Sequence, residues 1–151
     1  MKKALMVMAL AGVLTGCASV KMESAEATAK AQEFAAPAKG QSGLYVYRSM
    51  GPGTALKKDI FVDGKCLGES APKVFFYTQV EGDKEHILET ESEFSNNSLK
   101  MMFEAGKNYF VRQYIKLGVF VGGANLEQVD EAKGKEAVRE LKMATPGNCS
   151  K

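Results

Sequence analysis

The chain has 151 residues, of which 45% are hydrophobic and 25% are charged, with 20 Lys and Arg against 18 Asp and Glu. Its length corresponds to one domain, and its hydrophobic share is that of a globular protein and not of a charged disordered chain. The near balance of charge excludes a nucleic-acid binder that works through a basic stripe, because such a protein needs a strong positive excess to displace counterions from phosphates.

Residues 1–16 have the layout of a signal peptide. Lys2 and Lys3 precede an uncharged run that ends at Leu14, well short of the roughly 20 apolar residues that span a bilayer. The run ends in Leu14-Thr15-Gly16-Cys17, which resembles the lipobox of bacterial lipoproteins. In that class the cysteine thiol receives a diacylglycerol, and the cysteine becomes the mature N-terminus. The alternative is an ordinary secretory signal in which a cysteine happens to lie at the cleavage site.

Lipidation of Cys17 would attach the protein to the membrane through N-terminal acyl chains such as palmitate, each buried methylene contributing about 0.8 kcal/mol. In this class an aspartate directly after the cysteine retains the protein in the inner membrane, whereas here Ala18 and Ser19 follow. The resemblance therefore implies an outer-membrane lipoprotein whose domain faces the periplasm. Without Lys2 and Lys3, the remaining basic residues equal the acidic ones in number, so the mature chain is neutral.

Residues 17–41 are expected to form the lipidated N-terminus and a flexible tether. The stretch from Met22 to Glu33 is rich in residues that favour a helix, but it lacks a continuous apolar stripe. Pro37 and Gly40 then interrupt the pattern. The alternative is a helix that binds a partner.

Residues 42–143 are expected to form the folded domain, because short β-prone runs alternate with turn residues. The clearest signal is a hairpin over residues 56–68, whose Asp63-Gly64 turn accepts positive φ. A second hairpin is expected over residues 99–116. The other expected strands cover residues 44–48, 74–80, 86–91 and 125–129.

Residues 130–143 change to a helical spacing of apolar residues, with Asp130 as the N-cap. Gly134 weakens the first turns, so the helix should be firmest from residue 135 onward. Pro146 and Gly147 make residues 144–151 a tail. The predicted fold is mainly β: a single antiparallel β-sandwich or open barrel of seven to eight short strands, with a short C-terminal helix.

Several short segments follow one another in a characteristic order: Gly43–Arg48, Val62–Lys65, Glu104–Arg112, Val119–Gly122 and Val129–Gly134. This order resembles an uncharacterised bacterial lipoprotein family, domain of unknown function 2846, over nearly the whole mature chain. The resemblance implies neither a reaction nor a ligand, so it supplies no catalytic residue.

A weaker resemblance links residues 61–68, with Gly82 and His86, to the PEGA β-sandwich module of surface proteins. That module usually has a proline before the glycine, where this chain has Glu81. It also has one residue between the glycine and the next strand, where this chain has Asp83-Lys84-Glu85.

His86 is the only histidine, and the acidic residues near it suggest a metal site. Side chains alternate along a strand, however, which sends His86 to one face and Glu89 and Glu91 to the other. We therefore expect an acidic surface, with no metal ion and no cofactor. The rival class of function is a glycan or peptidoglycan hydrolase, which needs two carboxylates about 5 to 9.5 Å apart. Glu89, Glu91, Glu93 and Asp63 supply carboxylates, but no spacing singles out a catalytic pair.

Cys66 and Cys149 remain once Cys17 is lipidated. An oxidising periplasm favours a disulfide between them, which would close a long loop and contribute on the order of 4 kcal/mol. The alternatives are two independent thiols, or a link to another molecule through the tail. A nucleophilic role for Cys66 is not expected, because no base forms a recognisable constellation with it.

Six aromatic residues fall on the strand faces opposite the expected core residues: Tyr45, Tyr47, Phe75, Tyr77, Phe110 and Tyr114. If the C-terminal helix or the N-terminal segment covers them, they form a second layer of core. If they are uncovered, they form a binding face for a glycan or a protein, since tyrosine offers contact area and a polar group.

The glycine-rich stretch Gly118–Ala124 lacks the Lys-Ser/Thr of a phosphate-binding loop. We expect it to be a strand bend or bulge, where missing side chains allow close backbone approach.

These features together favour a non-catalytic binding or structural accessory module of the cell envelope. Its expected partners are the membrane and an envelope protein or glycan, and not nucleic acid.

Overall fold

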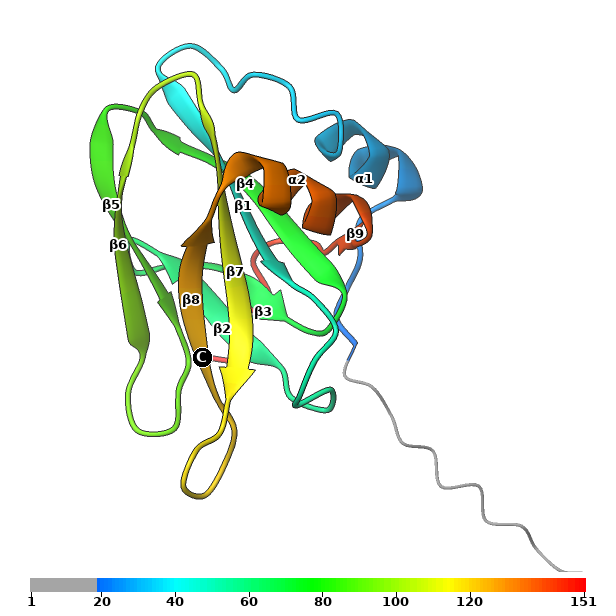
Figure 1. Cartoon of the computed structure of the whole chain (residues 1–151), viewed down its shortest axis with the longest axis vertical. Coiled ribbons are helices and arrows are strands. Elements are labelled where there is room, and N and C mark those ends of the chain that lie inside the picture. Colours follow the sequence, from blue (N-terminus) through cyan, green and yellow to red (C-terminus); the bar gives the residue numbers. More distant parts are fainter. Residues whose placement is uncertain (1–18) are drawn as a thin grey trace, which may run out of the picture.

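The computed structural model describes residues 19–151 (Figure 1). The expected signal peptide and the expected lipidation site, Cys17, lie outside the described residues. The described chain forms two β-sheets packed face to face, with two short helices on the outer side of the larger sheet. Neither helix has the length and apolar character needed to cross a membrane.

The larger sheet has the order β8-β7-β1-β4-β9. Its strands are β1 (Gln41–Arg48), β4 (Val74–Glu81), β7 (Asn108–Lys116), β8 (Gly123–Val129) and β9 (Lys142–Met143). At its centre β1 pairs antiparallel with β4 and parallel with β7. The outermost strand, β9, is parallel to β4.

The smaller sheet has the order β3-β2-β5-β6 and is antiparallel throughout. Its strands are β2 (Lys58–Val62), β3 (Lys65–Ser70), β5 (Lys84–Thr90) and β6 (Asn97–Phe103). The turn between β2 and β3 is Asp63-Gly64, with φ of 50° and 75°. The hairpin expected there is confirmed.

The main core lies between the sheets, where alternate residues of the strands meet. Leu44 and Val46 of β1 and Phe76 of β4 face Leu88 of β5 and Phe103 of β6, and all five are buried. Burial of each such side chain stabilises the fold by about 1.5–3 kcal/mol.

The helix α2 (Glu131–Arg139) lies on the outer face of the larger sheet. Asp130 caps it as expected, accepting a hydrogen bond from the Lys133 amide. The expectation that it would be firmest after residue 135 and continue to 143 is wrong, because it ends at Arg139 and residues 142–143 form β9. Gly134 is required by packing: a Cβ there would lie 2.2 Å from Cγ of Phe110.

The predicted mainly β sandwich with a short C-terminal helix is confirmed, but three details differ. The two strands expected to form a hairpin over residues 99–116 do not pair, because β6 belongs to the smaller sheet and β7 to the larger one. The described chain has nine strands instead of seven or eight, since β9 replaces the end of the expected helix. It also has two parallel pairs, so the sandwich is not wholly antiparallel. Alternation of side chains identifies strands but carries no information about which distant strand each will pair with.

The N-terminal segment, expected to be a flexible tether, packs on the domain throughout residues 20–34. Val20 contacts the main core and Met22 forms a β-bridge with Ala144. The helix α1 (Ala25–Ala31) follows, with the Ser24 hydroxyl accepting a hydrogen bond from the Ala27 amide. The expectation of a flexible tether was wrong, because single contacts with residues far along the chain hold this segment in place. Such contacts do not require a continuous apolar stripe, so the sequence pattern did not indicate them.

Candidate functional site

The six aromatic residues proposed as a binding face are mostly covered. Tyr45, Tyr47, Phe75 and Phe110 are buried beneath α1 and α2, so the internal cover foreseen as one alternative is what the structure shows. The rings of Tyr45 and Phe110 stack with centroids 4.9 Å apart, and Phe34 meets both edge-on.

Contacts between distant segments hold this cover in place. The Tyr45 hydroxyl donates to the Ala31 carbonyl at the end of α1, at 2.9 Å. Burial, and secondarily the neighbouring Tyr77, raises the pKa of Tyr45 well above its usual value. The Gln32 side-chain amide donates to the carbonyls of Val138 and Leu141, each at 2.9 Å, and so ties α1 to the end of α2.

Tyr77 and Tyr114 remain partly exposed. Tyr77 lines a shallow cleft of about 420 Å³ between α1 and β4, whose floor is largely alanine and tyrosine. The Gln79 side chain at its rim already accepts a hydrogen bond from the Ala38 amide. Tyr114 lies at the other side of the sheet, where Arg112 approaches its ring and Asn125 donates to its hydroxyl. The six residues therefore do not form one continuous surface.

His86 is buried, on the inward face of β5 with Leu88, while Glu89 is partly exposed on the opposite side. Nδ1 of His86 lies 2.5 Å from the Asp63 carboxylate, and Nε2 lies 2.8 Å from the Glu81 carbonyl. The hydrogen bond from His86, with a further one from the Ile87 amide, lowers the pKa of Asp63. This arrangement braces the β2–β3 turn against β5.

Three of the four carboxylates considered for hydrolysis are bound to different parts of the chain, and the fourth, Glu89, accepts only a 3.4 Å hydrogen bond from the Ser98 hydroxyl among the residues that the structure describes. Asp63 pairs with His86, whereas Glu91 accepts a hydrogen bond from the Asp59 amide and forms an ion pair with Lys151. Glu93 accepts hydrogen bonds from three backbone amides of the β7–β8 loop. Across residues 19–151, no three His, Cys, Asp or Glu side chains come together as a metal site.

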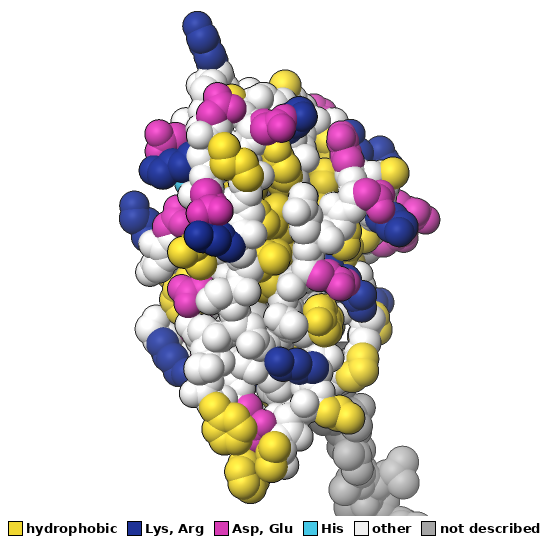
Figure 2. Space-filling view, turned by 60° about the vertical axis from the view of Figure 1, so that its left-hand side comes forward, with side chains coloured by type: hydrophobic (Ala, Val, Ile, Leu, Met, Phe, Trp, Pro, Cys, Tyr) yellow, Lys and Arg dark blue, Asp and Glu magenta, His cyan; other side chains and the backbone are white. Residues whose placement is uncertain are grey.

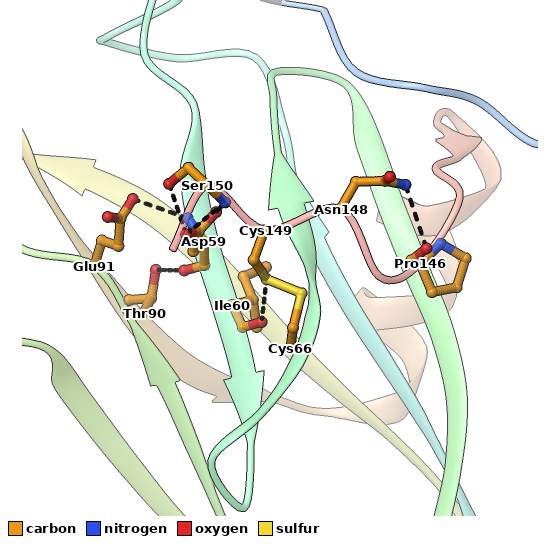
Figure 3. Close-up of a disulfide and its surroundings, with 9 residues drawn as sticks. All are labelled: Asp59, Ile60, Cys66, Thr90, Glu91, Pro146, Asn148, Cys149 and Ser150. Carbon is orange, nitrogen blue, oxygen red and sulfur yellow. Dashed lines mark hydrogen bonds between the residues drawn. A yellow bond between two sulfur atoms is a disulfide. The ribbon is translucent and has the colours of Figure 1, made fainter.

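A disulfide joins Cys66 of β3 to Cys149 of the C-terminal tail, with a Cα–Cα distance of 6.0 Å (Figure 3). Next to it the buried Asp59 accepts hydrogen bonds from the Ser150 amide at 3.0 Å and from its hydroxyl at 2.7 Å. The expected tail is thus fixed to the smaller sheet almost to its last residue. In the chain-entropy model the cross-link contributes about 4.5 kcal/mol, because it spans 83 residues.

The loops at one end of the sandwich carry an uncovered group of large hydrophobic side chains, here called the apolar tip. Leu117 is 97% exposed and Phe120 is 82% exposed. Phe94 of the β5–β6 loop meets Phe120 edge-on, with ring centroids 6.5 Å apart. Figure 2 shows hydrophobic side chains gathered at the lower end of the molecule. The members of the apolar tip are Phe94, Leu117, Val119, Phe120 and Val121.

The backbone of the apolar tip wraps around the Glu93 carboxylate. The amides of Val119, Phe120 and Val121 all donate to it, the first at 2.6 Å. Loss of solvent raises the pKa of Glu93, but the three amides together outweigh it and hold that pKa below its usual value. Gly118 permits the tight path, since a Cβ there would lie 1.7 Å from the Val121 carbonyl oxygen. The stretch expected as a strand bend or bulge is therefore a hairpin loop organised by an acidic side chain.

Sequence reasoning missed the apolar tip, although two signals pointed to it. Residues 117–124 contain no charge, and glycines flank three consecutive hydrophobic residues. A hydrophobic run normally indicates a buried strand, and only the structure shows that this one lies in a solvent-exposed loop.

The comparisons with known proteins identify a family but add no activity. The family model described as "Protein of unknown function (DUF2846)" matches residues 38–124, from just before β1 to the start of β8. An uncharacterised protein of Haemophilus influenzae is 54% identical over 138 residues, which is 91% of this chain and 82% of that protein.

Proposed function

The chain belongs to the DUF2846 family, and we propose that it is a lipid-anchored lipoprotein of the bacterial envelope. In this proposal Cys17 carries the acyl chains, and the domain stands on the periplasmic side of the outer membrane. The molecule works there as a non-catalytic binding or structural accessory module.

The use of the three cysteines carries the proposal. Cys66 and Cys149 are joined in a disulfide, as is typical of proteins in oxidising compartments. The third, Cys17, ends the Leu14–Cys17 sequence that resembles a lipobox. Each cysteine thus has a role suited to an envelope lipoprotein.

The fixed carboxylates favour a non-catalytic role over the rival hydrolase. The Asp63 carboxylate binds His86 beside the β2–β3 turn, and the Glu91 carboxylate pairs with Lys151 at the end of the chain. The Glu93 carboxylate accepts hydrogen bonds from the β7–β8 loop. A hydrolase would need two carboxyl groups facing one another across a bound sugar. Incubation of the purified protein with peptidoglycan should therefore release no soluble fragments, and release would favour the hydrolase.

Acylation is tested by mass spectrometry of the mature N-terminal peptide and by metabolic labelling with a fatty acid. The wild-type protein should be labelled and the Cys17→Ser variant should not. Cys149→Ser is the matched control, because it removes a cysteine from the domain and leaves Leu14–Cys17 intact. A wild-type protein without label, or cleaved at another residue, would contradict the anchor.

Sorting is tested separately by fractionation of inner and outer membranes. The wild-type protein should be found in the outer membrane. Ala18→Asp places an aspartate directly after Cys17 and should shift the protein to the inner membrane, whereas Ala18→Asn should not. Equal distribution of all three proteins would contradict the proposed sorting.

A further inference from the structure

The apolar tip projects from the same end of the sandwich as the start of the described chain. The amide of Ala144, which bridges Met22, donates to the Phe75 carbonyl near the start of β4. That end of β4 lies beside the end of β1, because Val74 pairs with Arg48. Since β7 runs parallel to β1, the loop after β7 leaves from this end too. In Figure 1 the dark blue start of the described chain and the β7–β8 loop both occupy the lower half of the molecule.

The chain between Cys17 and the domain is very short. Val20 already contacts the main core, so only three residue steps separate it from Cys17. Three steps of extended chain span at most about 10 Å, whatever their conformation. An acyl anchor on Cys17 would therefore hold this end of the domain at the membrane surface and leave no room for a layer of other protein beneath it.

The composition of the apolar tip suits the boundary between lipid headgroups and acyl chains. Residues 117–124 carry no charge, and Glu93, the residue before Phe94, accepts hydrogen bonds from backbone amides. Those amides would otherwise need water, and an apolar environment penalises unpaired backbone donors. Lys116 is exposed at the end of β7, directly before the apolar tip, where anionic headgroups would attract it.

We propose that the apolar tip inserts into the periplasmic leaflet of the membrane, to which Cys17 is anchored, and so fixes the orientation of the domain on the bilayer. The inference rests on the proposed function, because the anchor sets the distance to the membrane. Phe120, Leu117 and Phe94 enter the interfacial region, as the apolar residues of interfacial proteins do. The opposite end of the sandwich, with the β6–β7 loop, then points into the periplasm.

The test uses tryptophan as a depth probe, because the chain contains none. The full acylated protein carrying Phe120→Trp is reconstituted into vesicles of phosphatidylethanolamine and phosphatidylglycerol, with or without lipids brominated on their acyl chains. A second probe, Phe94→Trp, reports from the other loop of the apolar tip. The matched control is Met102→Trp, since Met102 is 57% exposed near the opposite end of β6.

Insertion predicts a blue-shifted emission for both probes in the apolar tip, and loss of most of that emission when brominated lipid is present. The Met102→Trp emission should stay at the solvent-exposed wavelength and be unaffected by bromine. Mass spectrometry of the N-terminal peptide from the same samples reports acylation, and flotation of the vesicles reports anchoring.

The outcomes separate the two proposals. An acylated protein that floats with the vesicles, but whose Phe120→Trp and Phe94→Trp emission is solvent-like and unquenched, overturns membrane insertion and leaves the anchor standing. A blue shift without quenching by bromine also overturns it, and points to a contact between protein molecules. A protein without acyl chains that fails to float refutes the anchor itself, and with it the insertion that depends on it.

Discussion

Two parts of the molecule are rich in aromatic and aliphatic side chains, but one of them is covered in the structure and the other is exposed. The outer face of the larger sheet is closed by α1 and α2, with Phe34 packed against Tyr45 and Phe110. The apolar tip, with Phe120 and Phe94, is left open to solvent. The outer face of the larger sheet therefore stabilises the domain, whereas the apolar tip contributes little to folding and is available for binding.

The largest expected effect separates these two parts directly. Phe110→Ala removes a fully buried ring from beneath α2 and should lower the free energy of unfolding by about 3–5 kcal/mol. Phe120→Ala removes the same side chain from the apolar tip and should change it by no more than about 0.5 kcal/mol. Urea or thermal unfolding of both variants measures the difference. Similar losses would mean that the apolar tip is part of the folded core.

The close fit of α2 on the sheet gives the next prediction. Gly134→Ala adds a Cβ that would overlap Phe110, so α2 must move outward, at an expected cost of about 2 kcal/mol. The control is Gly51→Ala, where an added Cβ meets no atom within 4 Å. In a peptide helix the same Gly-to-Ala change stabilises, so a more stable Gly134→Ala protein would show that α2 is not held closely against Phe110.

The features that sequence alone predicted are those fixed by neighbouring residues. Asp63-Gly64 formed the expected turn, Asp130 capped α2, and His86 lay on the face opposite Glu89 because side chains alternate along β5. Each of these depends on the local backbone, which the amino-acid pattern describes.

The features that sequence missed or left open depend on contacts between distant residues. The pairing of β1 with β7 joins strands about sixty residues apart and runs parallel, with no hairpin to signal it. The cover over the aromatic face depends on Gln32 reaching Val138, and the shape of the apolar tip on Glu93 reaching Val119. Such pairs leave no periodicity in the sequence, so the sequence did not show that the aromatic face is covered and the apolar tip exposed.

The hydrogen bonds of Gln32 allow the cover to be weakened without touching the aromatic core. Gln32→Ala removes the donor to the carbonyls of Val138, in the last turn of α2, and Leu141, just after it, and should lower the free energy of unfolding by about 1 kcal/mol. Hydrogen exchange should also become faster at the end of α2, since α1 no longer holds it. Glu33→Ala is the control, because Glu33 is the exposed neighbour of Gln32. Equal exchange rates in both variants would mean that α1 covers the sheet by packing alone.

The smallest expected effect lies in the apolar tip, where Glu93 organises the loop without supporting the rest of the fold. Glu93→Gln keeps the size of the side chain but removes the charge that binds the amides of Val119 and Phe120. These amides should therefore exchange faster, while the unfolding midpoint stays nearly unchanged.

The same hydrogen bonds should depend on pH. Because the folded state lowers the pKa of Glu93, the bonds are fully present above the usual glutamate pKa of about 4.3 and are lost as the pH falls through the lower folded value. After correction for intrinsic exchange, wild-type protection of the loop should therefore fall in acid, and Glu93→Gln should show no such step. Glu89→Gln on β5 is the matched control and should retain the wild-type profile. A pH-dependent loss that persists in Glu93→Gln would assign the step to another group and remove Glu93 as the organiser of the apolar tip.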